Sequence, residues 1–331
     1  MKKRFSTAIL LFSILLTLSA CSNETYDETH IFAMDTVISI KIAKDSANRG
    51  YFEKCRQIIE EVEQRFSKTV DTSEVTSFNQ SKTGLSSPSD ELISLIEPAL
   101  NISAQTGGAF DITVEPLVSL WDITGENPAV PAQDEIASLL QHVGYEKITL
   151  TDTALNKAET GVQIDLGGIA KGYALGEIVS YLSGQGVAYG TVSFGGNIGV
   201  IGTKPDGSRW NIGIKDPEST QGQIGAVSIE TGYIAVSGDY ERYFEYNGKR
   251  YHHILDPKTG YPADTGIHSA AVICQDPVLA DALSTALFVM GIDKAMQFYT
   301  DGLYKFEAVF VTENGILCTD GIKEYFTPKK G

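Results

Sequence analysis

Three side chains in the last quarter of the sequence could bind a metal ion together. Asp281, Ser284 and Thr285 stand at positions i, i+3 and i+4 of the segment DPVLADALSTALFVMG. In a helix this spacing puts a carboxylate and two hydroxyls on one face, and such hard oxygen ligands suit Mg²⁺ better than Zn²⁺. The alternative is that the hydroxyls bond back to the preceding helical turn while Asp281 is merely exposed. The spacing alone leaves both interpretations open.

Two adjacent histidines could supply a general base. His252 and His253 are two of only five histidines, and they lie in RYHHILDPKTGYPADTG between a predicted strand and an Asp256-Pro257 turn. Because side chains alternate along a strand, only one of the two can face a given cleft. An imidazole is suited to proton transfer near neutral pH, although a structural histidine is the commoner case.

Two glycine-containing segments could bring backbone close to a ligand. In QIDLGGIAKGYALG we expect Asp165 to end a strand, Gly167 and Gly168 to form a tight turn, and Lys171 to open a helix. Such a turn can direct carbonyl oxygens at a cation and amides at a phosphate, but a plain strand-to-helix turn is the alternative. The spacing is neither that of a P-loop nor of a dinucleotide fingerprint. TGGAFDITVEPLVSLW places Asp111 beside bulky apolar residues, which is a weak signal by itself.

Helical periodicity predicts the helices that must position these residues. Apolar residues keep helical spacing in GYFEKCRQIIEEVEQRF, and a second helix runs from about Ser89 in SDELISLIEPALNISAQTGG. Another follows Lys171. The strongest helix has Asp276 as its N-cap and Gly291 at its end.

Strands are predicted by alternation and by turn residues. TVISIKIA alternates as a half-buried strand does, and glycine separates the short strands VAYGTVSF, NIGVIG, NIGIK and AVSIET. Asn247-Gly248 and Asn314-Gly315 predict hairpins. Strands and helices neither alternate strictly nor segregate, which indicates an α+β fold with mixed or antiparallel sheets and packed helices.

The N-terminus has the pattern of a targeting signal. Three basic residues precede the apolar run AILLFSILLTLSA, which is too short to span a bilayer comfortably. The following LSAC resembles a lipobox, so we expect Cys21 to be lipidated, with an ordinary secretory signal cleaved near Ala20 as the alternative. We predict a signal peptide over 1–20, a tether over 21–30 and one domain over 31–331, anchored by lipid to the cell membrane on its extracytoplasmic side.

Charge and cysteine content exclude several classes of partner and site. The net charge of −16 disfavours nucleic acid, and it requires that any phosphate-bearing ligand meet local positive charge, a metal or backbone amides. Cys55, Cys274 and Cys318 are widely spaced without a CxxC motif. We therefore expect neither a cysteine zinc site nor a disulfide framework, and we expect Cys55, on the apolar face of a helix, and Cys274, in a strand-like run, to be buried thiols.

Eight segments in a fixed order resemble the ApbE family of FAD:protein FMN transferases. They are MDTVISI, SEVTSFNQ, TGGAFDITVEPLVSLW, IDLGGIAKGYALG, SFGGNIGVIG, SGDYERYF, YHHILDPKTGYP and ADALSTALFVMG. The resemblance spans roughly residues 32–291, and its specificity lies in the conjunction, because no single motif would be decisive. Family members often have glycine where Asp35 stands.

The resemblance implies an ApbE-like fold with a ligand cleft between two lobes in a single catalytic domain. It implies an Mg²⁺-dependent enzyme that takes FAD as substrate, moves FMN onto a threonine hydroxyl of an exported protein and releases AMP. Asp281, Ser284 and Thr285 would hold the metal together with a backbone carbonyl of the turn from Gly168 to Ala170. The catalytic residues would be Asp281 and His253, which would deprotonate the acceptor threonine. The FAD site would be lined by Met34, Asn79, Ala109, Phe110, Asp111, Asp165, Lys171, His253, Ile254 and Leu255.

Two alternatives stay open at this point. Some family members mainly hydrolyse FAD to FMN and AMP. Asn79 is the position that we would associate with the balance between FMN transfer and hydrolysis. A flavin-binding lipoprotein without turnover would need neither His253 nor the pair of Asp281 and Thr285. The chain contains no DGxxSGAT-like acceptor motif, so we expect the acceptor to be another polypeptide that carries one.

Overall fold

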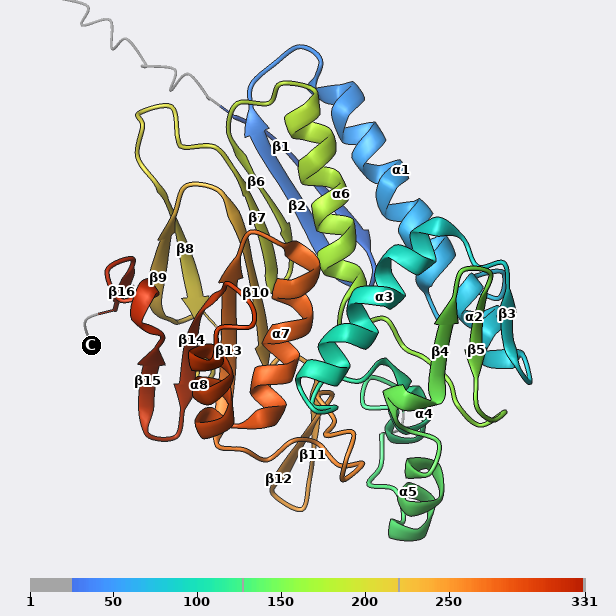
Figure 1. Cartoon of the computed structure of the whole chain (residues 1–331). Helices are drawn as coiled ribbons and strands as arrows, with labels where there is room; N and C mark the ends of the chain where they lie inside the picture. Colours follow the sequence, from blue (N-terminus) through green and yellow to red (C-terminus); the bar gives the residue numbers. More distant parts are fainter. Residues whose placement is uncertain (1–25, 127, 220, 330–331) are drawn as a thin grey trace, which may run out of the picture.

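The computed structural model describes residues 26–126, 128–219 and 221–329 (Figure 1). The helices are α1 (Asn48–Phe66), α2 (Glu74–Gln80), α3 (Asp90–Gln105), α4 (Glu115–Trp121), α5 (Gln133–Leu140), α6 (Ala170–Gly184), α7 (Pro277–Met290) and α8 (Ile292–Asp301), with short 3₁₀ turns η1 (Ile112–Val114), η2 (Tyr145–Lys147) and η3 (Asp320–Ile322). The strands are β1 (Tyr26–Ala33), β2 (Thr36–Ala43), β3 (Gly84–Ser86), β4 (Ile148–Thr151), β5 (Ala154–Lys157), β6 (Gly190–Phe194), β7 (Asn197–Ile201), β8 (Trp210–Lys215), β9 (Gln223–Ile229), β10 (Gly232–Gly238), β11 (Tyr243–Tyr246), β12 (Lys249–His252), β13 (Ile267–Cys274), β14 (Glu307–Thr312), β15 (Gly315–Cys318) and β16 (Phe326–Pro328).

An eight-stranded sheet forms the centre of the fold. Its strand order is β1-β2-β6-β7-β10-β13-β14-β15, and each of these neighbouring pairs is antiparallel. Ile38, Ile40 and Ile42 on β2 are fully buried, as their alternation predicts. The predicted α+β class with antiparallel sheets is therefore confirmed.

Helices cover one face of this sheet. α1 packs on β1, α6 on β6 and β7, and α7 on β10 and β13 (Figure 1). In α1 the buried side chains Cys55, Ile59, Val62 and Phe66 repeat every three or four residues, which confirms the helix predicted there. Each large apolar side chain buried in this layer contributes roughly 1.5–3 kcal/mol to stability.

A small second sheet covers the other face. β8, β9 and β16 pair with one another, and their apolar side chains join those of the large sheet in a separate core cluster that includes Trp210, Val227, Ile234 and Val309. Away from both layers, β3, β4 and β5 form a third sheet and β11 and β12 an isolated hairpin. The hairpin carries His252 and leads directly to His253.

Caps and turns agree with the sequence in most places. The Asp276 carboxylate accepts bonds from the amides of Val278 and Leu279 at 2.9 and 3.1 Å, so it is the N-cap of α7 as predicted. Asn247 and Gly248 both have positive φ, 51° and 76°, as a type I′ hairpin requires. Cys55 and Cys274 are buried and free. Burial raises the pKa of the Cys55 thiol to about 12 and that of Cys274 to about 11, so both thiols are unreactive.

Three local predictions differ from the structure. The segment before Asp165 belongs to no strand, so the predicted strand there is wrong. In the β14–β15 hairpin Thr312 pairs with Gly315, so the turn lies at residues 313–314 rather than at Asn314-Gly315. β1 begins at Tyr26, inside the predicted tether.

The predicted signal peptide, the lipidation site Cys21 and the first part of the tether lie outside the described residues. Within the part that the structure describes, no helix is long and apolar enough to cross a membrane.

Candidate active site

One cavity of about 750 Å³ gathers residues from separate parts of the chain. Its lining includes the β1–β2 turn, the end of α1, the start of α6, the segment after β12 and one face of α7. The predicted site residues that line it are Met34, Ala109, Phe110, Asp111, Asp165, Gly168, Ala170, Lys171, His253, Ile254, Leu255, Asp281 and Thr285.

A close crossing of α6 and α7 fixes one wall of the cavity. A Cβ atom added to Gly172 would lie 2.3 Å from the carbonyl oxygen of Pro277 and 2.8 Å from Cβ of Asp281, so only glycine allows the two helices to approach this far. The Gly172 amide donates to Oδ2 of Asp281 at 2.8 Å. Asp281 on α7 thus accepts from an amide in the first turn of α6 that has no partner within its own helix. Its other oxygen, Oδ1, accepts no hydrogen bond within the described residues.

The two hydroxyls of α7 differ in what they contact. The Ser284 hydroxyl donates to the carbonyl oxygen of Asp281 at 2.8 Å and lies 2.8 Å from Oγ of Ser237; it is buried and does not line the cavity. Thr285 does line the cavity, and its Oγ1 lies 3.1 Å from Oγ of Ser237. Ser284 therefore supports the wall, whereas Thr285 presents its hydroxyl to the cavity.

The turn before α6 completes this wall. A Cβ atom at Gly168 would meet the Phe110 ring at 3.1 Å and Oγ1 of Thr285 at 4.0 Å, so the glycine backbone passes close to both. The carbonyl oxygen of Gly167 accepts from Nζ of Lys171 at 2.7 Å, whereas that of Gly168 accepts no backbone or side-chain hydrogen bond among the described residues. The Gly168 carbonyl is thus available to a ligand.

An ion-pair network stands beside this turn. Oδ1 of Asp165 accepts from the Gly167 amide at 2.7 Å, and its Oδ2 lies 3.0 Å from Nζ of Lys68, which is also 3.4 Å from Oε1 of Glu115. Desolvation lowers the pKa of Lys68, but Asp165 and Glu115 outweigh it, so the pKa is raised and the ammonium stays charged.

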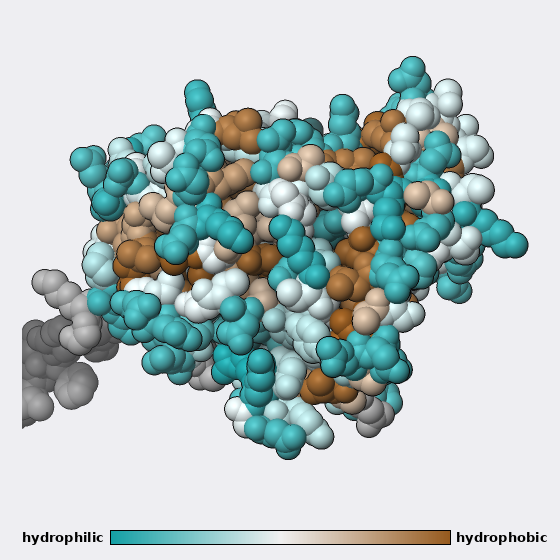
Figure 2. All heavy atoms as spheres, turned by 60° about the horizontal axis from the view of Figure 1, so that its bottom comes forward, coloured by the Kyte–Doolittle hydropathy of each residue, from teal (hydrophilic) through white to brown (hydrophobic). Residues whose placement is uncertain are grey.

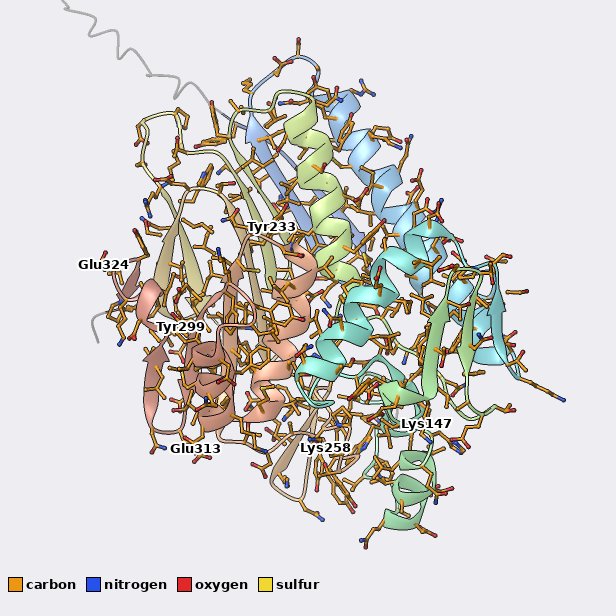
Figure 3. The ribbon with its side chains drawn as sticks, in the orientation of Figure 1. Lys147, Tyr233, Lys258, Tyr299, Glu313 and Glu324 are labelled. Atoms are coloured by element: carbon orange, nitrogen blue, oxygen red, sulfur yellow. The ribbon has the colours of Figure 1, made fainter. Side chains whose placement is uncertain are left out.

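The two adjacent histidines face different surroundings. His252 is buried against Phe288, its Nε2 lies 2.9 Å from the Ala263 carbonyl oxygen, and its Nδ1 accepts from the Ile254 amide at 3.3 Å. His253 lines the cavity, and its Nδ1 lies 3.3 Å from the Arg242 carbonyl oxygen. That acceptor keeps the proton on Nδ1, so Nε2 is left as a base. Figure 3 shows Lys258, in the turn that follows, beside the β11–β12 hairpin at the lower end of the molecule.

The environment of His253 keeps the ring neutral. Desolvation by the cavity walls and then the positive charges of Arg242 and Lys171 lower its pKa from 6.5 to about 3. His253 is nevertheless exposed to solvent, so water screens part of this effect. The lowered pKa still keeps the ring neutral near pH 7. A neutral imidazole can accept a proton at any pH near 7.

A model of the ApbE family matches residues 34–310 of this chain. The chain belongs to the ApbE family. It is 31% identical over 331 residues to the FAD:protein FMN transferase of Haemophilus influenzae, which covers 95% of each chain. It is 38% identical over 221 residues to the FAD:protein FMN transferase of Treponema pallidum, covering 62% of this chain and 61% of that one.

Solved ApbE structures share the fold. The ApbE protein of Thermotoga maritima superposes with a TM-score of 0.84 at 39% identity, over 91% of this chain and 99% of that one. The flavin transferase ApbE of Vibrio cholerae gives a TM-score of 0.81 at 28% identity over the same shares. The predicted ApbE-like fold is therefore confirmed.

Two residues that the ApbE resemblance assigns to the flavin site have structural roles here. Asn79 does not line the cavity; its amide donates to the Ile164 carbonyl oxygen at 2.9 Å and accepts from the Ile164 amide at 2.7 Å. Asp111 lines the cavity, but its oxygens accept from Thr113 and from the Tyr145 amide. Desolvation raises the pKa of Asp111 against these hydrogen bonds. Both side chains hold loops of the ApbE fold in place.

Other residues around the ApbE cavity were not predicted as site residues. Lys68, Trp121, Ser237 and Arg242 line it. Trp121, Ser237 and Arg242 lie in motifs that carried the family resemblance, so position within a motif was the available signal. Lys68 lies in a polar segment after α1, and nothing in its spacing marks it.

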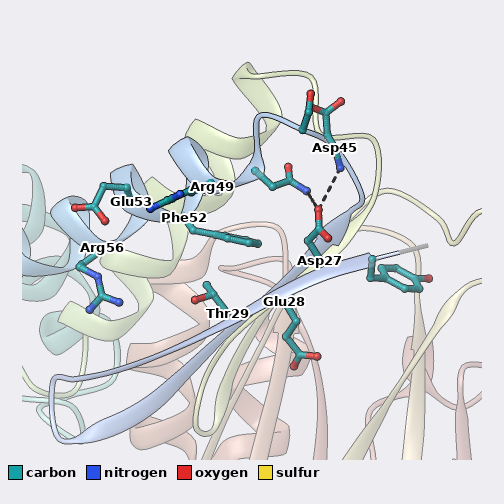
Figure 4. A pocket seen from close by; sticks show the side chains of 11 residues that line it. Asp27, Glu28, Thr29, Asp45, Arg49, Phe52, Glu53 and Arg56 are labelled. Carbon is teal, nitrogen blue, oxygen red and sulfur yellow. Dashed lines mark hydrogen bonds between the residues drawn. The ribbon is translucent and has the colours of Figure 1, made fainter. Parts of the chain in front are cut away.

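A second hollow lies far along β1 from this ApbE cavity. It has a volume of about 630 Å³ and lies between β1 and α1, where Oδ2 of Asp27 accepts from the Asp45 amide and from the Asn48 side chain (Figure 4). None of the predicted site residues lines it.

Proposed function

We propose that this protein transfers FMN from FAD to a threonine hydroxyl of an exported acceptor protein and releases AMP, with Mg²⁺ as its metal. The observation that supports this most is that His253, Lys171, Asp281 and Thr285 all line the same cavity. A neutral base, a cation and hard oxygen ligands are the groups that phosphoryl transfer from a pyrophosphate requires.

His253 acts as the general base in this proposal. Nε2 of His253 takes the proton from the acceptor threonine, whose oxygen forms a bond to the phosphorus of the FMN half. The bond from that phosphorus to the bridging oxygen breaks, and AMP leaves with this oxygen. The Arg242 carbonyl oxygen near Nδ1 holds the tautomer that leaves Nε2 free.

The wall formed by α7 and the turn before α6, here called the metal wall, offers oxygen ligands that suit Mg²⁺, with a single carboxylate among them. The described residues contain no group of three or more His, Cys, Asp or Glu side chains that could hold a metal. Oδ1 of Asp281, the Thr285 hydroxyl and the Gly168 carbonyl are hard oxygen donors, and Mg²⁺ commonly completes its six ligands with water and phosphate. When bound, the ion would neutralise charge on the pyrophosphate.

The cations of the cavity compensate for an acidic protein. FAD brings two phosphate charges to a chain with a net charge of −16, so binding needs local positive charge. Lys171 and Arg242 line the cavity, and neither forms an ion pair with a carboxylate among the described residues. Both are available to the phosphates or to an acidic acceptor.

The location and the acceptor belong to the same proposal. We infer that Cys21 carries a lipid anchor and that the enzyme works on the extracytoplasmic side of the cell membrane. Its acceptor is another exported polypeptide with a DGxxSGAT-like motif, since the chain itself has none.

One assay separates the transferase from its alternatives. Soluble protein from Ser22 onward is incubated with FAD, Mg²⁺ and an acceptor that carries a DGxxSGAT sequence, and intact mass is recorded. A gain of one FMN, lost with EDTA, is the expected result. Free FMN and AMP with an unmodified acceptor would instead identify a hydrolase, and intact bound FAD a binding protein.

Asp281→Ala tests the metal wall in the same assay. We expect the Mg²⁺-dependent rate to fall at least about 100-fold, because a metal that stabilises the leaving group supplies several kcal/mol. Normal metal dependence in this variant would refute the site.

A further inference from the structure

Two exposed apolar side chains stand next to each other on the β1–β2 hairpin, one pair before its turn. Phe32 on β1 pairs directly with Val37 on β2, and they are 78% and 57% exposed, the highest values among the large apolar side chains of the described residues. A direct cross-strand pair lies on one face of the hairpin. Figure 2 shows the lower side of the molecule, where hydrophobic side chains reach the surface in several separate patches.

The turn between these two residues belongs to the cavity. Met34, Asp35 and Thr36 line the cavity, and Met34 and Asp35 have φ values of 51° and 56°, which fix a tight turn. Aspartate tolerates this left-handed conformation better than most residues do. Phe32 and Val37 are not part of the lining, so a ligand inside the cavity leaves them uncovered.

Hydrogen bonds attach the turn to both sides of the cavity. The Met34 amide donates to Oε1 of Glu63 on α1 at 3.2 Å. On the other side, Nη2 of Arg242 donates to the Asp35 carbonyl oxygen at 3.2 Å. These bonds fix the turn that Phe32 and Val37 flank. Arg242 also links this turn to His253, whose amide donates to the Arg242 carbonyl oxygen at 3.0 Å.

We propose that the Phe32–Val37 pair is the docking point for the flavin-accepting polypeptide, and that it contacts apolar side chains flanking the acceptor threonine. This inference rests on the proposed function. The open side of the cavity, with His253 and the β1–β2 turn, is here called the rim. A threonine hydroxyl that reaches Nε2 of His253 must pass this rim, and the residues on either side of that threonine must lie against the surface around the rim.

Charge at the rim favours the same occupant. Arg242 forms no ion pair with a carboxylate among the described residues, although the chain has a net charge of −16. It therefore offers a positive charge to an acidic side chain next to the acceptor threonine, such as the aspartate of a DGxxSGAT-like motif. Aromatic side chains and arginine are both enriched in protein interfaces.

The test compares two double variants of the full-length chain in detergent. Phe32→Thr with Val37→Thr removes the apolar pair and keeps residues that suit strands. Ile316→Thr with Leu317→Thr is the control, because these side chains are 38% and 45% exposed on β15, at the opposite edge of the same sheet. Binding of a fluorescent acceptor protein with a DGxxSGAT sequence is measured by anisotropy with FAD and EDTA, and its KM with FAD and Mg²⁺.

We expect the Phe32 and Val37 variant to bind the acceptor about tenfold more weakly, with an equal rise in KM for the acceptor and no change in FAD affinity. The control should match the wild type. An unchanged acceptor Kd, an equal loss in the control, no acceptor binding by the wild type, or a shift in oligomeric state caused by the substitutions would overturn the docking site.

Binding and transfer also distinguish this inference from the proposed function. Acceptor that binds through Phe32 and Val37 but gains no FMN would support the docking site and contradict the transferase. FMN transfer by the wild type, together with undiminished acceptor binding by the double variant, would support the transferase and contradict the docking site.

Discussion

The two walls of the cavity are built in opposite ways. At the α6–α7 crossing, Asp281 and Ser284 are 4% and 1% exposed, and a helix amide and neighbouring hydroxyls fix their oxygens. At the rim, His253 and the β1–β2 turn are held by a few hydrogen bonds and are open to solvent. The difference indicates that the wall at the α6–α7 crossing depends on close packing, whereas the rim is accessible to solvent and, in the proposed function, to the acceptor polypeptide. Substitutions in the first wall should reduce stability and activity together, and those at the rim activity alone.

The largest effect should come from His253→Ala. Loss of a general base commonly lowers a rate by 10²–10⁴-fold, so we expect FMN transfer to fall by about that factor. FAD affinity and Tm should change little, because the ring lies at the open side of the cavity. Stopped assays, flavin fluorescence and thermal melts measure the three quantities. His30→Ala, on exposed β1 surface, is the control, and full activity in His253→Ala would sink the assignment.

Gly172→Ala should disturb the packed wall. The added methyl group clashes with Pro277 and Asp281 and forces α6 and α7 apart, which we expect to cost about 1–3 kcal/mol of unfolding free energy. The displaced Asp281 should also raise the Mg²⁺ concentration needed for half-maximal activity. Urea unfolding and Mg²⁺ titration measure both effects. Gly184→Ala is the matched control, since it lies in the same helix with nothing within 4 Å of the new methyl group; equal behaviour of the two variants would contradict the packing argument.

The smallest effect is a pH dependence of stability. Burial lowers the pKa of folded His252 below its usual 6.5, so the unfolded chain binds more protons between the two values. The free energy of unfolding should therefore be fully retained above pH 6.5 and fall as pH drops below it, by at most about 1.4 kcal/mol per pH unit for each such histidine. Urea unfolding between pH 5 and 8 measures the slope. His252→Gln should reduce the slope without removing the share of His253, and an unaltered slope would contradict this account.

Regular elements of the fold could be predicted because their signals are local. Helical spacing identified α1, α3 and α7, and the Asp276 cap and the Asn247-Gly248 turn were readable from a few adjacent letters. Capping and turn chemistry act over two to four residues, so one sequence contains all the information. The family motifs extended this to most of the residues that line the cavity.

The remaining features depend on contacts between distant segments. Asn79 bonds to Ile164, 85 residues away, so its place outside the cavity could not be inferred from its neighbours. Lys157 also depends on distant partners. Its buried ammonium donates to the carbonyl oxygens of Phe78, Asn79 and Val162, and burial lowers its pKa. The pairing of Lys68 with Asp165 and Glu115 is likewise tertiary. Such partners follow only from the packed fold.

The direction of β1 has a geometric consequence for an anchored enzyme. β1 runs from Tyr26 to the turn that lines the cavity, and eight residues rising about 3.3 Å each separate these ends by roughly 25 Å. If the chain before Tyr26 is tied to a bilayer, as proposed, β1 can hold the cavity up to about this far above Tyr26, and does so when the strand points away from the bilayer. An acceptor embedded in the same bilayer must then raise its threonine to a matching height, so stalk length would select among acceptors independently of their motif.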